Sequence, residues 1–123
     1  MEYQQFYDQL LISLPIGTIL NNPGGGTTKI SSYTKDNLAY VRGKSKIRVS
    51  IHDLYSAYSR FNGQVVTSTE LRAYLPRVFD SKVNGHSCNC TVLFMALKQM
   101  GLTGSIKGTG KRGDPFKVIL SIK

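Results

Sequence analysis

The sequence has 123 residues, of which 41% are hydrophobic and 19% are charged, and its formal net charge is +9 at pH 7. These proportions are those of a globular chain of about one domain, and they exclude a disordered tail or a coiled coil. The longest apolar runs, residues 10–12 and 92–97, are too short to span a bilayer, and the polar start is unlike a secretory signal, so we expect a cytoplasmic protein.

The excess of basic residues is the strongest signal in the composition. Sixteen Lys and Arg oppose only seven Asp and Glu. A compact basic chain repels itself unless it meets a polyanion, and nucleic acid is the commonest polyanion inside a cell. The few carboxylates lack the spacing of a metal-dependent nuclease or of a paired-carboxylate hydrolase. We therefore expect a binding protein with no enzymatic activity and no cofactor.

The chain begins with a predicted amphipathic helix over residues 2–14. Phe6, Leu10 and Leu14 share one face of this helix, and Pro15 ends it. This apolar face is a candidate surface for homodimerisation.

A β-meander is predicted to follow the first helix. Its connections are the glycine-rich stretch 21–26 and two short turns. Apolar residues alternate with polar ones in the last two strands, which predicts one solvated face that carries Arg42, Lys46 and Arg48. The strands predicted from alternation and turn residues are 16–20, 28–33, 38–42 and 46–49.

Two capping signals mark helices in the second half of the chain. Ser50 begins an amphipathic helix that continues to Phe61. Thr67 and Glu70 form a capping box that opens another helix, and Pro76 makes that helix short or kinked.

A third helix and a hairpin complete the predicted elements. The helix starts near Ser87 or Asn89, runs to Met100, and ends at Gly101. The hairpin has strands at 105–107 and 116–120. Its tip, residues 108–115, contains three glycines and a Lys-Arg pair.

The order helix, short strand, capped helix, loop, helix and hairpin resembles the winged helix-turn-helix superfamily over residues 50–122. The resemblance rests on element order, on capping and on the Gly-Lys-Arg-Gly hairpin tip. We therefore expect the α+β class, with a winged-helix-like half at 50–123. Residues 1–49 are then a small antiparallel β-rich half, either a separate unit or part of the same domain.

The resemblance implies that residues 89–100 are a recognition helix lying in the major groove of double-stranded DNA and that residues 105–120 are a basic wing. The residues implied to be exposed at the start of this helix are Ser87, Asn89, Thr91 and Val92. Lys98 is the only basic residue within the helix, so the wing and the sheet are expected to contribute more of the binding. The wing residues expected to contact DNA are Lys107, Lys111, Arg112 and Lys117, and the strand residues are Arg42, Lys46 and Arg48.

These features together predict a small DNA-binding regulator, which as a homodimer would read two half-sites. The alternative is a module that binds an acidic protein, such as a phage-encoded inhibitor that blocks a nucleic-acid-processing enzyme through its basic surface. An enzyme that uses Cys90, His86 or His52 is a third interpretation.

His86, Cys88 and Cys90 form the most conspicuous local cluster. Zinc ligands are usually spaced more widely and number four, so we favour a helix start in which the two cysteines pack as small apolar groups. A catalytic cysteine is the other interpretation, because a helix N-terminus would lower the pKa of Cys90.

Tyr33 and Tyr40 lie on predicted strands beside Lys35 and Arg42. Aromatic residues interleaved with basic ones on a sheet can stack single-stranded bases. Ordinary packing between strands is the interpretation we favour.

Overall fold

The structure, a computed structural model, describes residues 1–120, so the end of the range 50–123 lies outside the described residues. The fold is α+β, as expected. A four-stranded antiparallel sheet has the order β1-β2-β3-β4, and β5 pairs separately with β6. The elements in chain order are α1 (Tyr3–Ser13), β1 (Ile19–Asn21), β2 (Thr27–Thr34), β3 (Asn37–Arg42), β4 (Ser45–Ser50), α2 (Ile51–Phe61), β5 (Val65–Thr67), α3 (Ser68–Tyr74), α4 (Pro76–Phe79), η1 (Ser81–Val83), α5 (Cys88–Gln99) and β6 (Lys117–Ile119).

The four-stranded sheet has a buried inner face and a solvated outer face. Tyr40 of β3 is paired with Ile47 of β4, and both side chains are buried. Lys46 and Arg48 flank Ile47 and therefore point to the outer face. Arg42 follows Tyr40 by two residues and shares its inner face, where it is half-buried. The prediction of one solvated face for all three basic residues is thus wrong for Arg42. The side chains of β3 that point toward the core include Tyr40, and Arg42, two residues later, points the same way.

Helix α1 packs its apolar face into the protein's own core. Phe6, Leu10 and Leu14 are fully buried, and the helix contacts both α2 and α5. The hydroxyl of Tyr7 donates to the carbonyl oxygen of Lys35 at 2.8 Å, which fixes α1 to the β2–β3 turn. The prediction that this face mediates dimerisation is wrong, since none of it is free to meet a second copy.

The capping signals act as predicted. Ser50 Oγ accepts a hydrogen bond from the backbone N–H of Asp53 at 3.3 Å and starts α2. Thr67 and Glu70 form a reciprocal capping box at the start of α3. Pro76 ends α3 and takes the first position of α4, so the predicted kink appears as two short helices.

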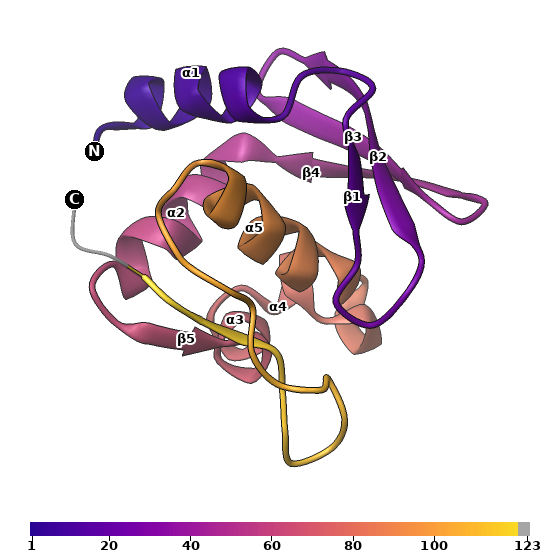
Figure 1. Cartoon of the computed structure of the whole chain (residues 1–123), viewed down its shortest axis with the longest axis vertical. Helices are drawn as coiled ribbons and strands as arrows, with labels where there is room; N and C mark the ends of the chain where they lie inside the picture. Colours follow the sequence, from indigo (N-terminus) through magenta and orange to yellow (C-terminus); the bar gives the residue numbers. More distant parts are fainter. Residues whose placement is uncertain (121–123) are drawn as a thin grey trace.

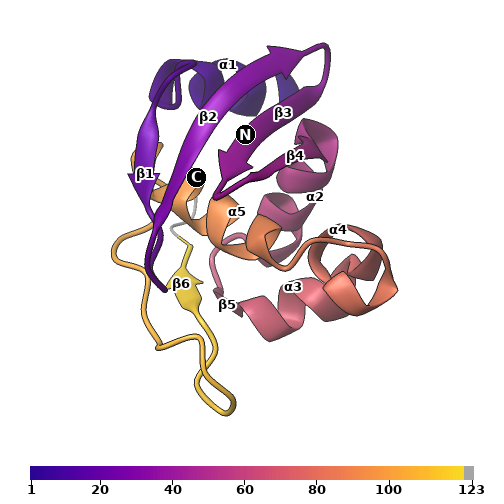
Figure 2. The ribbon, with the colours of Figure 1, turned by 90° about the vertical axis from the view of Figure 1, so that its right-hand side faces the viewer.

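Helix α5 lies in the middle of the molecule (Figure 1). The four-stranded sheet lies against one side of it, while α3 and α4 contact it elsewhere (Figure 2). Nine consecutive residues, Asn89 to Leu97, are buried. The buried side chains of both halves of the chain form one core cluster around this helix.

The C-terminal segment forms a loop that protrudes from one end of the molecule (Figure 2). Its return strand, β6, pairs with β5 through Val66 and Val118. The outgoing part of the predicted hairpin meets β6 only at the bridge between Lys107 and Lys117. From here on, the wing means residues 107–117, which lie within the range 105–120 expected from the sequence, and the word describes only this protruding loop.

Candidate nucleic-acid interface

Four separate segments surround a cleft of about 440 Å³, which we call the basic cleft. They are the end of β3, the start of α3, the start of α5 and the wing. The lining side chains include four cationic groups and no carboxylate. The lining residues are Arg42, Ser68, Thr69, Arg72, Ser87, Cys88, Cys90, Thr91, Gly110, Lys111, Arg112, Gly113, Pro115 and Phe116.

Two half-buried arginines in the basic cleft are held by threonine hydroxyls. Arg42 Nη1 donates to Thr91 Oγ1 at 3.2 Å, which links β3 to the first turns of α5. Arg72 Nη2 donates to Thr69 Oγ1 at 3.3 Å within α3. A hydroxyl orients a guanidinium but does not neutralise it, so both arginines keep a full positive charge.

Charge neutralisation is rare throughout the described part of the chain. Across residues 1–120, the one contact within 4 Å between a basic and an acidic side chain joins His52 Nε2 to Asp36 Oδ1 at 3.6 Å, and it is an ion pair only when the histidine is protonated. The carboxylates nearest in sequence to the basic cleft have other partners: Glu70 caps α3, and Asp114 accepts from the backbone of Thr109. Every charged side chain that lines the basic cleft is therefore cationic, while Glu70 and Asp114 lie beside lining residues along the chain.

The wing holds Lys111 and Arg112 in an exposed tight turn. Asp114 shapes the turn, because its Oδ2 accepts from Thr109 N at 3.1 Å and its carbonyl accepts from Gly110 N at 2.9 Å. Gly110 has a φ of +77° and lies against the ring of Phe116, where an added Cβ would meet the ring at 2.4 Å. Backbone hydrogen bonds and this close contact thus set the position of the two cationic side chains.

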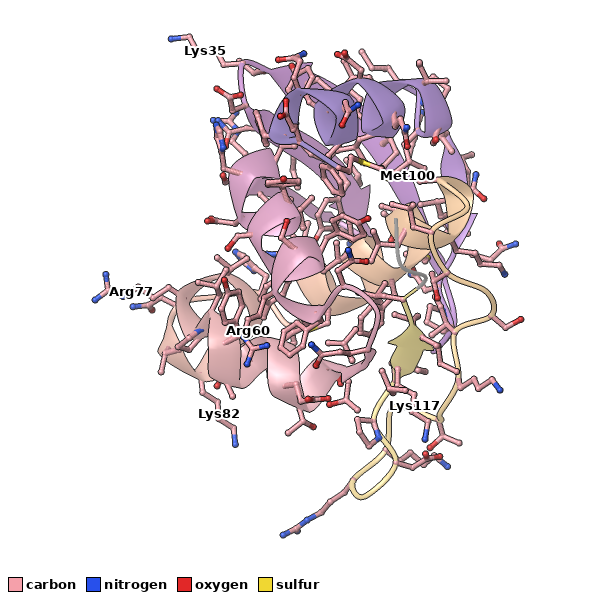
Figure 3. All side chains as sticks on the ribbon, turned by 90° about the vertical axis from the view of Figure 1, so that its left-hand side faces the viewer. Lys35, Arg60, Arg77, Lys82, Met100 and Lys117 are labelled. Atoms are coloured by element: carbon pink, nitrogen blue, oxygen red, sulfur yellow. The ribbon has the colours of Figure 1, made fainter. Side chains whose placement is uncertain are left out.

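Lys107 and Lys117 face each other at the base of the wing. Their backbones exchange two hydrogen bonds of 2.9 Å, so the two side chains emerge on the same side of the bridge. Like charges directly opposite each other are destabilising, and an anion between them would relieve the repulsion. Neither residue lines the basic cleft, and Figure 3 shows Lys117 at its place on the wing.

A network of polar side chains extends from Cys88, which lines the basic cleft, into the interior. Asn89 donates through Nδ2 to the carbonyl oxygen of Val78 at 2.8 Å, and its Oδ1 accepts from the hydroxyl of Tyr40 at 2.6 Å. Because the tyrosine proton is committed to Asn89, Cys88 donates its S–H to the tyrosine oxygen across 3.1 Å. Burial also raises the pKa of Tyr40 far above its usual value, so its hydroxyl remains neutral.

Cys90 is a buried thiol rather than an activated one. Its Sγ lies 3.8 Å from the carbonyl oxygen of Ser68 and 3.9 Å from that of Phe79. Burial raises the pKa of Cys90 to about 12, which is opposite to the lowering that a catalytic role requires. His86 is exposed, and no three His, Cys, Asp or Glu side chains of residues 1–120 converge on a metal site.

The residues implied for the recognition helix do not reach solvent as expected. Asn89 is 2% exposed, Thr91 6% and Val92 0%, so the expectation that they face bases is wrong. The sheet and the neighbouring helices enclose this helix, which leaves it no face that could enter a groove. Ser87 is exposed and lines the basic cleft, and Lys98 is exposed at the opposite end of α5.

The remaining predicted residues divide into two groups. Arg42, Lys111 and Arg112 come together at the basic cleft, although they are distant in sequence. Lys46 and Arg48 lie on the outer face of the sheet.

Tyr33 and Tyr40 are packing residues. The hydroxyl of Tyr33 donates to the carbonyl oxygen of Leu14 at 2.6 Å, and Tyr40 is fully buried. Neither ring is a platform for bases.

Sequence reasoning did not identify Arg72, Thr69 or Phe116 as site residues. The capping box at Thr67 predicts the first turn of α3 correctly, and in this helix Thr69 is exposed, while Arg72 is half-buried and follows the buried Leu71. The sequence feature that could have indicated Arg72 is its place between the apolar residues Leu71 and Ala73 of a capped helix. No pattern in the sequence indicates Phe116 as a site residue, because its role depends on the wing folding back so that Gly110 lies against its ring.

No helix within residues 1–120 is long and apolar enough to cross a membrane. Comparison of the chain with models of known protein families, with curated proteins and with solved structures finds no match.

Proposed function

We propose that this protein binds nucleic acid, with double-stranded DNA the first target to test, and that it acts through contacts to phosphates in the basic cleft. It is proposed as a binding protein and not as an enzyme. The observation that carries the proposal is the pair of half-buried guanidiniums, Arg42 and Arg72, which have hydroxyl acceptors in a cleft without carboxylates.

The physical argument starts from the cost of burying charge. A cation that is partly removed from water is stabilised by an anion, and a guanidinium offers paired N–H donors that match two phosphate oxygens. Arg42 and Arg72 are oriented by Thr91 and Thr69 and have donors to spare. A phosphate in the basic cleft would complete their hydrogen bonding and offset their charge.

The start of α5 adds to this preference. Ser87, Cys88 and Thr91 of its first turns line the basic cleft, so the positive end of the helix dipole lies near this space, although the N–H groups of Asn89 and Cys90 already donate to the carbonyls of His86 and Ser87. Together with Lys111 and Arg112, this makes the basic cleft a site for phosphates rather than for base edges. Binding is therefore expected to depend weakly on sequence and strongly on salt.

The test is the fluorescence anisotropy of a labelled random DNA duplex, titrated at several salt concentrations. Four cationic side chains line the basic cleft. If each contacts a phosphate, the slope of log K against log salt is about −3.6 for duplex DNA. Arg72→Gln and Lys111→Gln should each reduce the slope by about 0.9.

Matched controls are available elsewhere on the surface. Arg60 on α2 and Lys35 at the β2–β3 turn are exposed and do not line the basic cleft, and Figure 3 shows Lys35 directed away from the molecule. Arg60→Gln and Lys35→Gln remove the same charges and should leave the slope within about 0.3 of the wild type. Absence of binding at low salt would refute the proposal and direct attention to an acidic protein partner.

A further inference from the structure

The basic cleft contains more positive charge than one internal phosphate can balance. Arg42, Arg72, Lys111 and Arg112 line it, and no lining residue is acidic. A phosphodiester carries a single negative charge, whereas a phosphate monoester carries about −1.5 to −2 at pH 7. Two neighbouring diesters supply a charge of about −2, whereas a terminal phosphate followed by one diester supplies about −2.5 to −3, so for the same number of phosphates the monoester comes closer to neutralising the four side chains.

The size of the basic cleft agrees with a small occupant. Its volume of about 440 Å³ is on the scale of a pocket for one small organic group. The ring of Phe116 lines the basic cleft beside the cationic groups. One edge of this half-buried ring packs against Gly110, and the part that lines the basic cleft offers a base an apolar contact that inorganic phosphate would not use.

The donors of the basic cleft come from several directions. Arg42 rises from the end of β3, Arg72 from α3, and the start of α5 presents Ser87. A terminal phosphate has three free oxygens, and it can accept from several directions at once, whereas an internal diester has only two. Because the donors converge from separate elements, they favour a phosphate at the end of a nucleic-acid strand over an internal one.

We infer that the basic cleft binds the terminal phosphate monoester of a nucleotide, either at the phosphorylated end of a nucleic-acid strand or on a free nucleoside monophosphate, in preference to internal phosphodiesters. This inference rests on the proposed function, because it specifies what the phosphate site accepts. The wing would lie beside the terminal nucleotide and contact it through Lys111 and Arg112.

The experiment is a competition assay by fluorescence anisotropy at about 100 mM salt, where contacts to exposed phosphates are already weakened. The labelled probe is a single strand that carries a 5′-phosphate. The competitors share one sequence: the strand with a 5′-phosphate, the strand with a 3′-phosphate, the strand with hydroxyls at both ends, and a closed dumbbell duplex without ends. Deoxyadenosine monophosphate is the fifth competitor.

A strand with a terminal phosphate is expected to compete at least about tenfold better than the hydroxyl strand and the dumbbell, since charge-assisted hydrogen bonds are lost without the monoester. Arg72→Gln and Arg112→Gln should abolish this preference, whereas Arg60→Gln should retain it. Arg112 is exposed, so Arg112→Gln tests the preference at a side chain that makes little contribution to packing, beside the half-buried Arg72.

The five competitors distinguish the possible outcomes. Competition by the mononucleotide equal to that of the phosphorylated strand supports the inference and assigns the site to free nucleotides, and much weaker competition assigns it to strand ends. Equal competition by phosphorylated, hydroxyl and closed nucleic acids overturns the inference but leaves the proposed function standing. Absence of binding by every nucleic acid overturns both.

Discussion

Replacing Gly110 by alanine tests whether contact with Phe116 positions the wing. Gly110 has a φ of +77°, and its Cβ would come within 2.4 Å of the Phe116 ring. Gly113, three residues further along the same turn, has a φ of +84° and nothing within 4 Å of its Cβ. Gly113→Ala therefore introduces the backbone strain alone, and Gly110→Ala introduces the same strain together with a steric clash.

The expected magnitudes follow from these two contributions. The left-handed backbone conformation costs an L-residue about 1–2 kcal/mol, which is the expected effect of Gly113→Ala. Forcing a methyl group against a packed ring adds about 1–3 kcal/mol in Gly110→Ala, unless the wing separates from Phe116 and avoids the clash. In either case Lys111 and Arg112 leave their places beside the basic cleft, so Gly110→Ala should also weaken binding.

Two measurements check this prediction. Thermal unfolding followed by circular dichroism should show a shift of roughly 4 °C for each kcal/mol lost. Anisotropy titrations should show a salt slope smaller by about 2 for Gly110→Ala, as expected if two phosphate contacts are lost, and a nearly unchanged slope for Gly113→Ala. Equal effects of the two substitutions on both stability and binding would refute the role given to Phe116.

Three further predictions concern the core and the hydroxyl that orients Arg42. Leu10→Ala should lower the free energy of unfolding by about 2–5 kcal/mol, whereas Ile12→Ala, at a side chain 79% exposed on the same helix, should change it by less than about 0.5 kcal/mol in denaturant titrations. Thr91→Val removes the acceptor of Arg42 Nη1 while keeping the shape, so we expect a loss of about 0.5–1.5 kcal/mol in stability and weaker DNA binding; unchanged affinity would contradict the orienting role. The pKa of Cys90 is raised from 9.0 to about 12, so the folded protein retains the thiol proton longer than the unfolded chain, and the free energy of unfolding should decline between about pH 9 and 12. This decline should be smaller in Cys90→Ala, and identical pH profiles for the two proteins would show that the thiol is not buried in solution.

The sequence predicted most elements because their determinants are local. Ser50 and Thr67 begin helices through hydrogen bonds to residues three positions on, and Pro15 and Pro76 interrupt helices through their own rings. The turns of the meander likewise depend on neighbouring residues. Such features need no knowledge of the rest of the fold.

The basic cleft could be predicted only in part because its geometry is not local. Lys111 and Arg112 were found as a charged turn, and Arg42 was found as a basic strand residue assigned to the wrong face. Arg72 joins them only because α3 packs against α5. Alternation along β3 could not decide which face was inward until pairing with Ile47 placed Tyr40 in the core.

Under the proposed function, the burial of α5 restricts the contacts that this protein could make to nucleic acid. A helix that is apolar on all sides is typical of a core rather than of a groove-binding surface, and residues 92–97 have that composition. Because Asn89 to Leu97 are buried, the exposed parts of α5 are its start, at the basic cleft, and its end at Lys98 and Gln99. Base edges in a groove are read by side chains projecting from an exposed element, whereas phosphates can be held by a helix N-terminus and by arginines. Under the proposed function, the same packing that stabilises the core favours contacts to phosphates over contacts to base edges, and the protruding wing (Figure 2) holds Lys111 and Arg112 beside the basic cleft.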